Sequence, residues 1–76
     1  MKDLVLYITK ALVDHPETVN IHEIQGEHTV VLEIHVDATD RGKVIGKEGR
    51  IIKAIRTVVG AASAKLNKRC SVELVE

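Results

Sequence analysis

Two glycines separated by two charged residues, in the segment Gly46-Lys47-Glu48-Gly49, are the part of this sequence best suited to binding a ligand. Glycine has no side chain, so the backbone of such a loop can approach a chain of sugars and phosphates closely. A helix that begins after the loop would point unpaired amide N–H groups and the positive end of its dipole at a phosphate. Lys47 and Arg50 would add positive charge. The spacing alone does not decide this, because a glycine that ends a helix before a turn gives the same pattern.

Positive charge is concentrated around this loop, although the 76-residue chain has a formal net charge of zero. Residues 1–40 hold two basic and eight acidic residues, a formal charge of −6. Residues 41–76 hold nine basic and three acidic residues, a formal charge of +6. This asymmetry predicts a basic surface that meets an anionic partner, whereas the alternative is that the charges only solvate the faces of helices.

The apolar pattern before the loop predicts a helix and then two strands. Apolar residues at helical spacing predict a helix that Asp3 caps and that His15-Pro16 ends, because the residue before a proline avoids the helical conformation. Residues 19–25 and residues 28–36 follow as strands, and in the second of them apolar residues alternate with polar ones.

The two strands are expected to form a hairpin. A two-residue turn at Gly26-Glu27 would place Leu32 opposite Ile21 and Ile34 opposite Val19. Both pairs would then lie on the face of the sheet that forms the core, so the predicted register is consistent with the apolar pattern.

The residues around and after the loop predict two further helices and a last strand. Asp40, or alternatively Thr39, is expected to cap a short helix over residues 41–45. A longer helix is expected from about residue 50 to residue 66, and residues 70–75 alternate as a strand. The core stripe of the longer helix is expected to comprise Ile51 or Ile52, Ile55, Val58 or Val59, Ala62 and Leu66. The order α-β-β-α-α-β predicts an α+β domain in which helices pack on one face of a three-stranded sheet.

The residues from Val44 to Arg56 resemble the signature of the KH family, in which Ile-Gly, two variable residues, Gly, two residues, Ile and a basic residue recur. The order of elements resembles the type II, prokaryotic KH fold, and the resemblance covers residues 1–76 as a single KH domain. It implies that single-stranded RNA is gripped by its backbone in a groove beside the glycine loop. The implied RNA-binding residues are Arg41, Lys43, Val44, Ile45, Gly46, Lys47, Glu48, Gly49, Arg50, Ile52 and Lys53. Val44, Ile45 and Ile52 are expected to offer apolar surface to the bases.

The resemblance also implies partners and a cellular role. Small bacterial KH proteins are described as RNA chaperones that self-associate, pair with a larger KH-containing protein and, in some bacteria, influence cell shape. In this chain, small residues recur at helical spacing and predict a face on which two subunits dock, because small side chains let helices approach closely. That face comprises Ala54, Thr57, Ala61 and Ala64. The alternative is a solvent-facing alanine surface.

Two other kinds of protein stay open on the residues alone. A dimerising scaffold of KH shape with weak or no RNA binding is compatible with Glu48, whose carboxylate repels phosphate, and with the zero net charge. A helix-hairpin-helix protein that grips DNA also places a glycine turn between helices, but the alternating strands argue against it. The residues do not distinguish RNA from single-stranded DNA.

Enzymatic, metal and membrane functions are not expected. The sequence has no nucleophile beside a base, no nucleotide-binding fingerprint and therefore no expected cofactor. In the predicted register no two of His22, His28 and His35 lie opposite each other, so no metal site is expected. Cys70 is expected to be a small buried residue. No apolar run is long enough for a membrane span, and we expect a soluble cytoplasmic protein.

Overall fold

A computed structural model describes residues 1–75, and their elements follow the predicted order. The helices are α1 (Lys2–Leu12), α2 (Arg41–Ile45) and α3 (Arg50–Ala64), and the strands are β1 (Asn20–Gln25), β2 (Thr29–His35) and β3 (Arg69–Leu74). Short 3-10 turns occupy Pro16–Thr18, Ala38–Asp40 and Lys47–Gly49. The prediction of an α+β fold in the order α-β-β-α-α-β is therefore confirmed.

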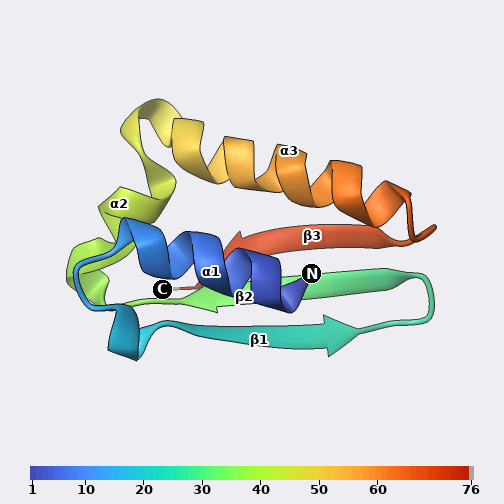
Figure 1. Ribbon diagram of the computed structural model, residues 1–76, viewed down its shortest axis with the longest axis horizontal. Coiled ribbons are helices and arrows are strands. Elements are labelled where there is room, and N and C mark those ends of the chain that lie inside the picture. Colours follow the sequence, from blue (N-terminus) through green and yellow to red (C-terminus); the bar gives the residue numbers. More distant parts are fainter. Residues whose placement is uncertain (76) are drawn as a thin grey trace.

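The three strands form one mixed sheet in the order β1-β2-β3. Strands β1 and β2 are antiparallel, whereas β2 and β3 are parallel. A parallel pair requires a crossover connection, and α2, the glycine loop and α3 provide it. Helix α3 runs alongside β3, and α1 lies over the sheet near its other edge (Figure 1). The crossover thus places the glycine loop at one end of the helical layer.

The hairpin register differs from the prediction. Ile21 lies opposite Ile34, and Glu23 lies opposite Leu32, so the predicted pairing through a two-residue turn is wrong. The connection is longer, and its ends are joined by a hydrogen bond of 2.7 Å from the Gly26 N–H to the Thr29 carbonyl. The difference is two residues, so the same side chains still face the core, because side chains alternate with a period of two.

The core lies between the sheet and the helices. Leu32 and Ile34 of β2 are fully buried. The buried residues of α3 are Ile52, Ile55, Val59 and Ser63. The predicted stripe is correct as far as Val59, but Leu66 is 60% exposed. The helix ends at Ala64 and Asn67 turns the chain with a positive φ, so Leu66 lies past the last helical turn.

Both predicted helix caps are wrong in detail. Helix α1 begins at Lys2, so Asp3 lies in its first turn, and the helix ends at Leu12 because Val13 is already extended. Asp40 precedes α2 without capping it through its side chain. Its carboxylate is instead buried and accepts hydrogen bonds from the backbone N–H groups of Asp14, at 3.2 Å, and His15, at 3.0 Å. Asp40 therefore ties the start of α2 to the segment that follows α1.

Candidate nucleic-acid interface

The glycine loop joins two helices through a tight turn. The Gly46 N–H donates to the Gly42 carbonyl at 2.9 Å and completes α2. The Gly49 N–H donates to the Gly46 carbonyl at 3.1 Å, and α3 begins at the next residue, Arg50. The first amide N–H groups of this 15-residue helix have no partner within the helix and lie directly beside the loop.

The two glycines are required for different reasons. Gly46 has φ 77° and ψ 173°, a region that is essentially restricted to glycine. A Cβ atom at Gly46 would also lie 2.5 Å from Cγ1 of Ile51, so a side chain does not fit there. Gly49 has φ 74° and ψ 16°, in the left-handed region, but the nearest atom to a Cβ there is Cε of Lys53 at 3.7 Å. Gly46 is therefore required both for its backbone conformation and because Ile51 packs against it, whereas Gly49 is required only for its backbone conformation.

The exposed charges of the loop are mixed. Glu48 also has a positive φ of 58°, and its carboxylate lies 3.6 Å from the Arg50 guanidinium. Lys47 and Lys53 are exposed and form no ion pair with any of residues 1–75. Arg50 is therefore partly neutralised within the loop, while two lysines beside the start of α3 keep their charge available to an anion.

The two basic residues of α2 are less available than predicted. The Lys43 ammonium forms an ion pair with the Asp14 carboxylate, and it lies 3.8 Å from Asp40. The hydrogen bond from Lys43 lowers the pKa of Asp14 and raises the pKa of Lys43. Arg41 is half-buried, and its Nε is buried without a hydrogen-bond partner in the described part of the chain. The flanking charge predicted for Lys43 is therefore already paired with a carboxylate of the chain, and its role in binding a ligand stays a prediction.

The apolar surface beside the loop also differs from the prediction. Val44 is 0% exposed and Ile52 is 7% exposed, so both are core residues and the prediction that they offer surface to bases is wrong. Ile45 is 39% exposed and does offer such surface. The physical reason is that α2 is only five residues long and packs on α3, so one side of it must be buried.

An apolar groove that the sequence did not reveal begins at the end of the loop. It has a volume of about 300 Å³ and lies between α1 and α3. It is lined by Ile8, Leu12, Arg50, Ile51, Ala54, Ile55 and Val58. The spacing of the α3 residues predicted an apolar stripe, but which part of that stripe α1 leaves uncovered depends on how the two helices pack.

A basic side chain connects α3 to the edge strand. The Arg56 Nε donates to the Val72 carbonyl at 3.0 Å, and its Nη2 lies 3.9 Å from the Glu73 carboxylate. Strand β3 is at the edge of the sheet, so the Val72 carbonyl belongs to its unpaired side. The glycine loop, α3 and the β3 edge thus lie along one side of the molecule (Figure 1).

The predicted stripe of small residues lies on the surface of α3. Ala54, Thr57, Ala61 and Ala64 are all exposed. Val58 of the same helix is 48% exposed and adds a larger apolar side chain. The stripe is therefore free of cover within the described chain, as a contact face between subunits requires.

A family model described as "KhpA/KhpB, KH domain" matches residues 2–74. The chain belongs to the KhpA/KhpB family of KH domains. The resemblance to the KH family is confirmed, and the matched residues include the glycine loop.

Relatives from several bacteria match this KH domain over nearly its whole length. The RNA-binding protein KhpA of Clostridium perfringens is 56% identical over 75 residues, which cover 99% of this chain and 100% of the relative. The RNA-binding protein KhpA of Chlamydia caviae is 51% identical over 76 residues, covering 100% of this chain and 97% of the relative. The RNA-binding protein KhpA of Aquifex aeolicus is 47% identical over 76 residues, covering 100% and 96%. No solved structure matches the chain.

The family assignment distinguishes between an RNA-binding protein, an enzyme and a helix-hairpin-helix protein. These relatives carry the name of a binding protein and not of an enzyme, so the prediction that the chain is not an enzyme is confirmed. The alternative of a helix-hairpin-helix protein is wrong, because the glycine loop belongs to a KH domain with a three-stranded sheet. None of the helices in residues 1–75 has the length and apolar character needed to cross a membrane.

Proposed function

We propose that this KH domain binds single-stranded RNA and grips the RNA backbone with the glycine loop. The observation that carries the proposal is the placement of Gly46 and Gly49 directly before α3, with Lys47 and Lys53 exposed and unpaired among the described residues. A phosphate beside Gly49 would meet the positive end of the α3 dipole and the first-turn amide N–H groups beyond Arg50, whose own N–H donates to the Lys47 carbonyl. The KhpA proteins of other bacteria are named as RNA-binding proteins, which supports RNA as the ligand.

The proposed grip involves few ionic contacts and no stacking on aromatic rings. Tyr7, the single aromatic residue, lies on α1 and is 77% exposed. Bases would rest on Ile45 and on the apolar groove between α1 and α3. Binding of this kind tolerates many sequences, because it depends on the backbone more than on base edges. We propose on this basis a cytoplasmic RNA chaperone or post-transcriptional regulator in a bacterium.

The test is to make the loop negatively charged while both glycines stay in place. Lys47→Asp combined with Glu48→Asp changes the formal charge by −2, and Lys65→Asp makes the same change beyond the far end of α3. We expect the loop variant to bind a short unstructured RNA at least about tenfold more weakly, since it loses one phosphate contact and gains repulsion. We expect the Lys65 variant to stay within about twofold of wild type, because short RNA at the loop lies beyond a Debye length of Lys65 at physiological salt.

The salt dependence supplies a second measurement. If Lys47, Arg50 and Lys53 neutralise about two or three phosphates, the logarithm of the binding constant falls against the logarithm of salt with a slope of about −1.4 to −2.1. Equal binding by the loop variant and by wild type, or no binding by wild type at low salt, would exclude the loop as the RNA grip.

We also propose that α3 forms a contact with a second copy of the chain or with a larger KhpB-like KH partner. The support is the exposed stripe of small residues together with Val58. Ala61→Arg places a long charged side chain in this stripe, and Ala11→Arg makes the same change on the exposed surface of α1. We expect only Ala61→Arg to sediment as a smaller species than wild type. Sedimentation equal to wild type would mean that the stripe is not the interface.

A dimerising scaffold without RNA binding is the second candidate. It is favoured by the Glu48–Arg50 pair, which removes one positive charge from the loop. The two measurements separate the candidates, since a scaffold loses association in Ala61→Arg and shows no RNA binding to lose in the loop variant.

A further inference from the structure

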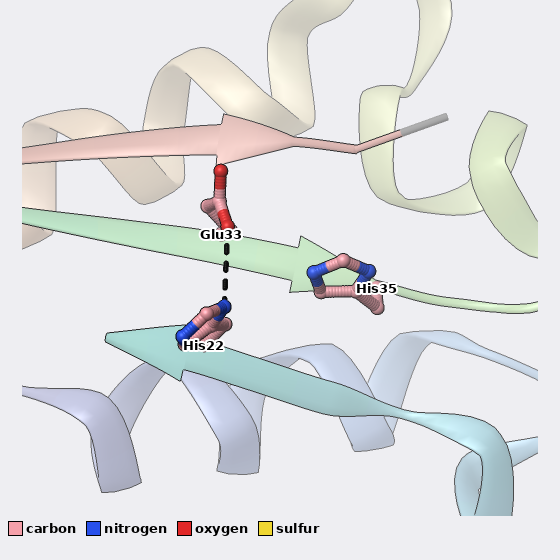
Figure 2. A group of neighbouring side chains, drawn as sticks. All are labelled: His22, Glu33 and His35. Atoms are coloured by element: carbon pink, nitrogen blue, oxygen red, sulfur yellow. Dashed lines mark ion pairs between the residues drawn. The ribbon is translucent and has the colours of Figure 1, made fainter. Parts of the chain in front are cut away.

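Three side chains capable of binding a metal ion meet on the outer face of the hairpin. His22 of β1 lies directly opposite Glu33 of β2, and His35 follows Glu33 by two residues on the same strand. Because side chains alternate along a strand, all three point away from the buried face that carries Ile21 and Ile34. Figure 2 shows the two imidazole rings and the carboxylate projecting from neighbouring strands toward one another.

The spacing of their donor atoms is close to that of a metal site. One ligand atom from each of the three residues lies within 4.8 Å of the others, and the His22 Nδ1 is 3.4 Å from the Glu33 Oε1. Two ligands of a tetrahedral ion with bonds of about 2.0–2.2 Å are about 3.3–3.6 Å apart. His22 and Glu33 already have this spacing. A shift of about 1–1.5 Å at His35, which side-chain rotation supplies, brings the third donor to the spacing that such an ion requires.

The donor set selects the class of ion. Two imidazoles and one carboxylate form a set that binds Zn²⁺ and other divalent ions of the first transition series, whereas Ca²⁺ and Mg²⁺ favour oxygen donors alone. We propose that His22, Glu33 and His35 bind one such ion, with Zn²⁺ as the representative. The helices pack on the opposite face of the sheet, so the remaining coordination position is open to water.

The charges around the cluster favour a cation there. Glu33 lies beside Glu73 in the parallel β2–β3 register, which places two carboxylates next to each other on the outer face. Arg56 reaches the Glu73 carboxylate at 3.9 Å, whereas the ionic partner of Glu33 among residues 1–75 is His22 alone. A divalent ion would neutralise Glu33 and reduce its repulsion with Glu73.

A simple ion pair does not account for all three residues. A protonated His22 beside Glu33 would explain the 3.4 Å contact between those two side chains. It leaves the His35 side chain half-buried at the same spot, without a hydrogen bond or ion pair to the rest of the described chain. A bound ion gives His35 a role that the ion pair does not.

The test is calorimetric titration of the full chain, free of any histidine tag, with ZnCl₂. We expect one Zn²⁺ to bind per chain. The affinity should be at least about tenfold weaker in each of His22→Gln, Glu33→Gln and His35→Gln, because even the loss of a residue that only hydrogen-bonds to a metal ligand lowers metal affinity by this much. All three side chains lie on the sheet surface, so the variants are expected to fold, which circular dichroism checks. Thermal unfolding should shift upward with Zn²⁺ in wild type and not in these variants.

The chain offers matched controls. His28 lies in the hairpin turn and His15 follows α1, so His28→Gln and His15→Gln remove a histidine without touching the cluster. Cys70→Ser removes the chain's one thiol, which is another side chain that could bind Zn²⁺. Burial raises the pKa of this thiol. We expect these three variants to bind Zn²⁺ within about twofold of wild type, and Mg²⁺ to give no heat.

The outcomes that overturn the proposal are specific. Absence of Zn²⁺ binding by wild type excludes the site. An equal loss in His28→Gln and His22→Gln means that histidines bind the ion without a defined site. A loss of Zn²⁺ binding that occurs only in Cys70→Ser would mean that the ion binds the thiol instead of the cluster. The cluster lies on the face opposite the helices and shares no residue with the proposed RNA grip, so each proposal is tested independently of the other.

Discussion

Replacing Gly46 by alanine tests the reason for the first glycine of the loop. The backbone at this position combines φ 77° with ψ 173°, and an added Cβ would lie 2.5 Å from Cγ1 and 2.9 Å from Cβ and Cδ1 of Ile51. Ile51 belongs to the first turn of α3, so its backbone cannot move away without shifting the start of that helix. Gly46→Ala therefore introduces both an unfavourable backbone conformation and an overlap of atoms.

The two effects have separate magnitudes. A residue other than glycine in such a backbone region costs about 1–3 kcal/mol. Overpacking against a side chain that cannot yield costs about another 1–3 kcal/mol. A 76-residue domain is stabilised by only about 4–11 kcal/mol at the usual free energy per residue. Gly46→Ala should therefore remove a large part of the free energy of unfolding.

Gly49→Ala is the matched control. It adds the same methyl group at a positive φ, here in the left-handed region, but the nearest atom to the added Cβ is 3.7 Å away. The left-handed conformation alone costs about 1–2 kcal/mol. Both variants restrict the unfolded chain equally, so that contribution cancels in the comparison.

Urea unfolding followed by circular dichroism measures the difference. With a slope of about 1 kcal/mol per molar urea, the midpoint of Gly46→Ala should fall at least about 1 M below that of Gly49→Ala. Equal midpoints for the two variants would contradict this prediction, since they would show that Ile51 yields to the added methyl group and that only the backbone conformation matters.

Three further predictions follow from buried and paired residues. Asp40→Ala leaves two partly buried amide N–H groups without their carboxylate and should lower the free energy of unfolding by about 3 kcal/mol, as urea unfolding would measure. Val44→Ala should cost about 2 kcal/mol of stability, whereas Ile45→Ala should cost well under half of that, because only Val44 is fully buried. The hydrogen bond from Lys43 lowers the pKa of Asp14 below its ordinary value of 3.8, so this pair stabilises the fold above pH 3.8 and ceases to do so as the pH falls through the lowered pKa. The stability difference between wild type and Asp14→Asn should accordingly be present at neutral pH and shrink in acid, and a difference that grows in acid would contradict the sign.

The elements of the fold could be predicted because they depend on local patterns. Apolar residues with helical spacing identified α1 and α3, and alternation identified β2 and β3. The hairpin register could not be predicted in the same way. Pairings that differ by two residues place the same side chains in the core, so the apolar pattern does not choose between them. The length of the connection between Gln25 and Val30 makes the choice, and it depends on packing across the sheet.

Some residues of the candidate interface could likewise be predicted from the sequence, and others could not. The glycines, Lys47 and Lys53 were recognisable from residue type and spacing, and the structure leaves both lysines exposed. The role of Val44 was not recognisable, because an apolar residue beside a loop is equally suited to the surface and to the core. Its burial follows from how the short helix α2 packs on α3.

Residue types and their spacing were sufficient to predict the order of elements, the glycine loop and the half of the chain that carries positive charge. Each of these depends on residues that are neighbours along the chain. The tertiary structure alone decided which charges are paired, as for Lys43 with Asp14, 29 residues apart. It also decided that His22 and His35 meet at Glu33, since that contact depends on the hairpin register. The physical reason is that contacts between distant residues are selected by packing, which no local spacing records.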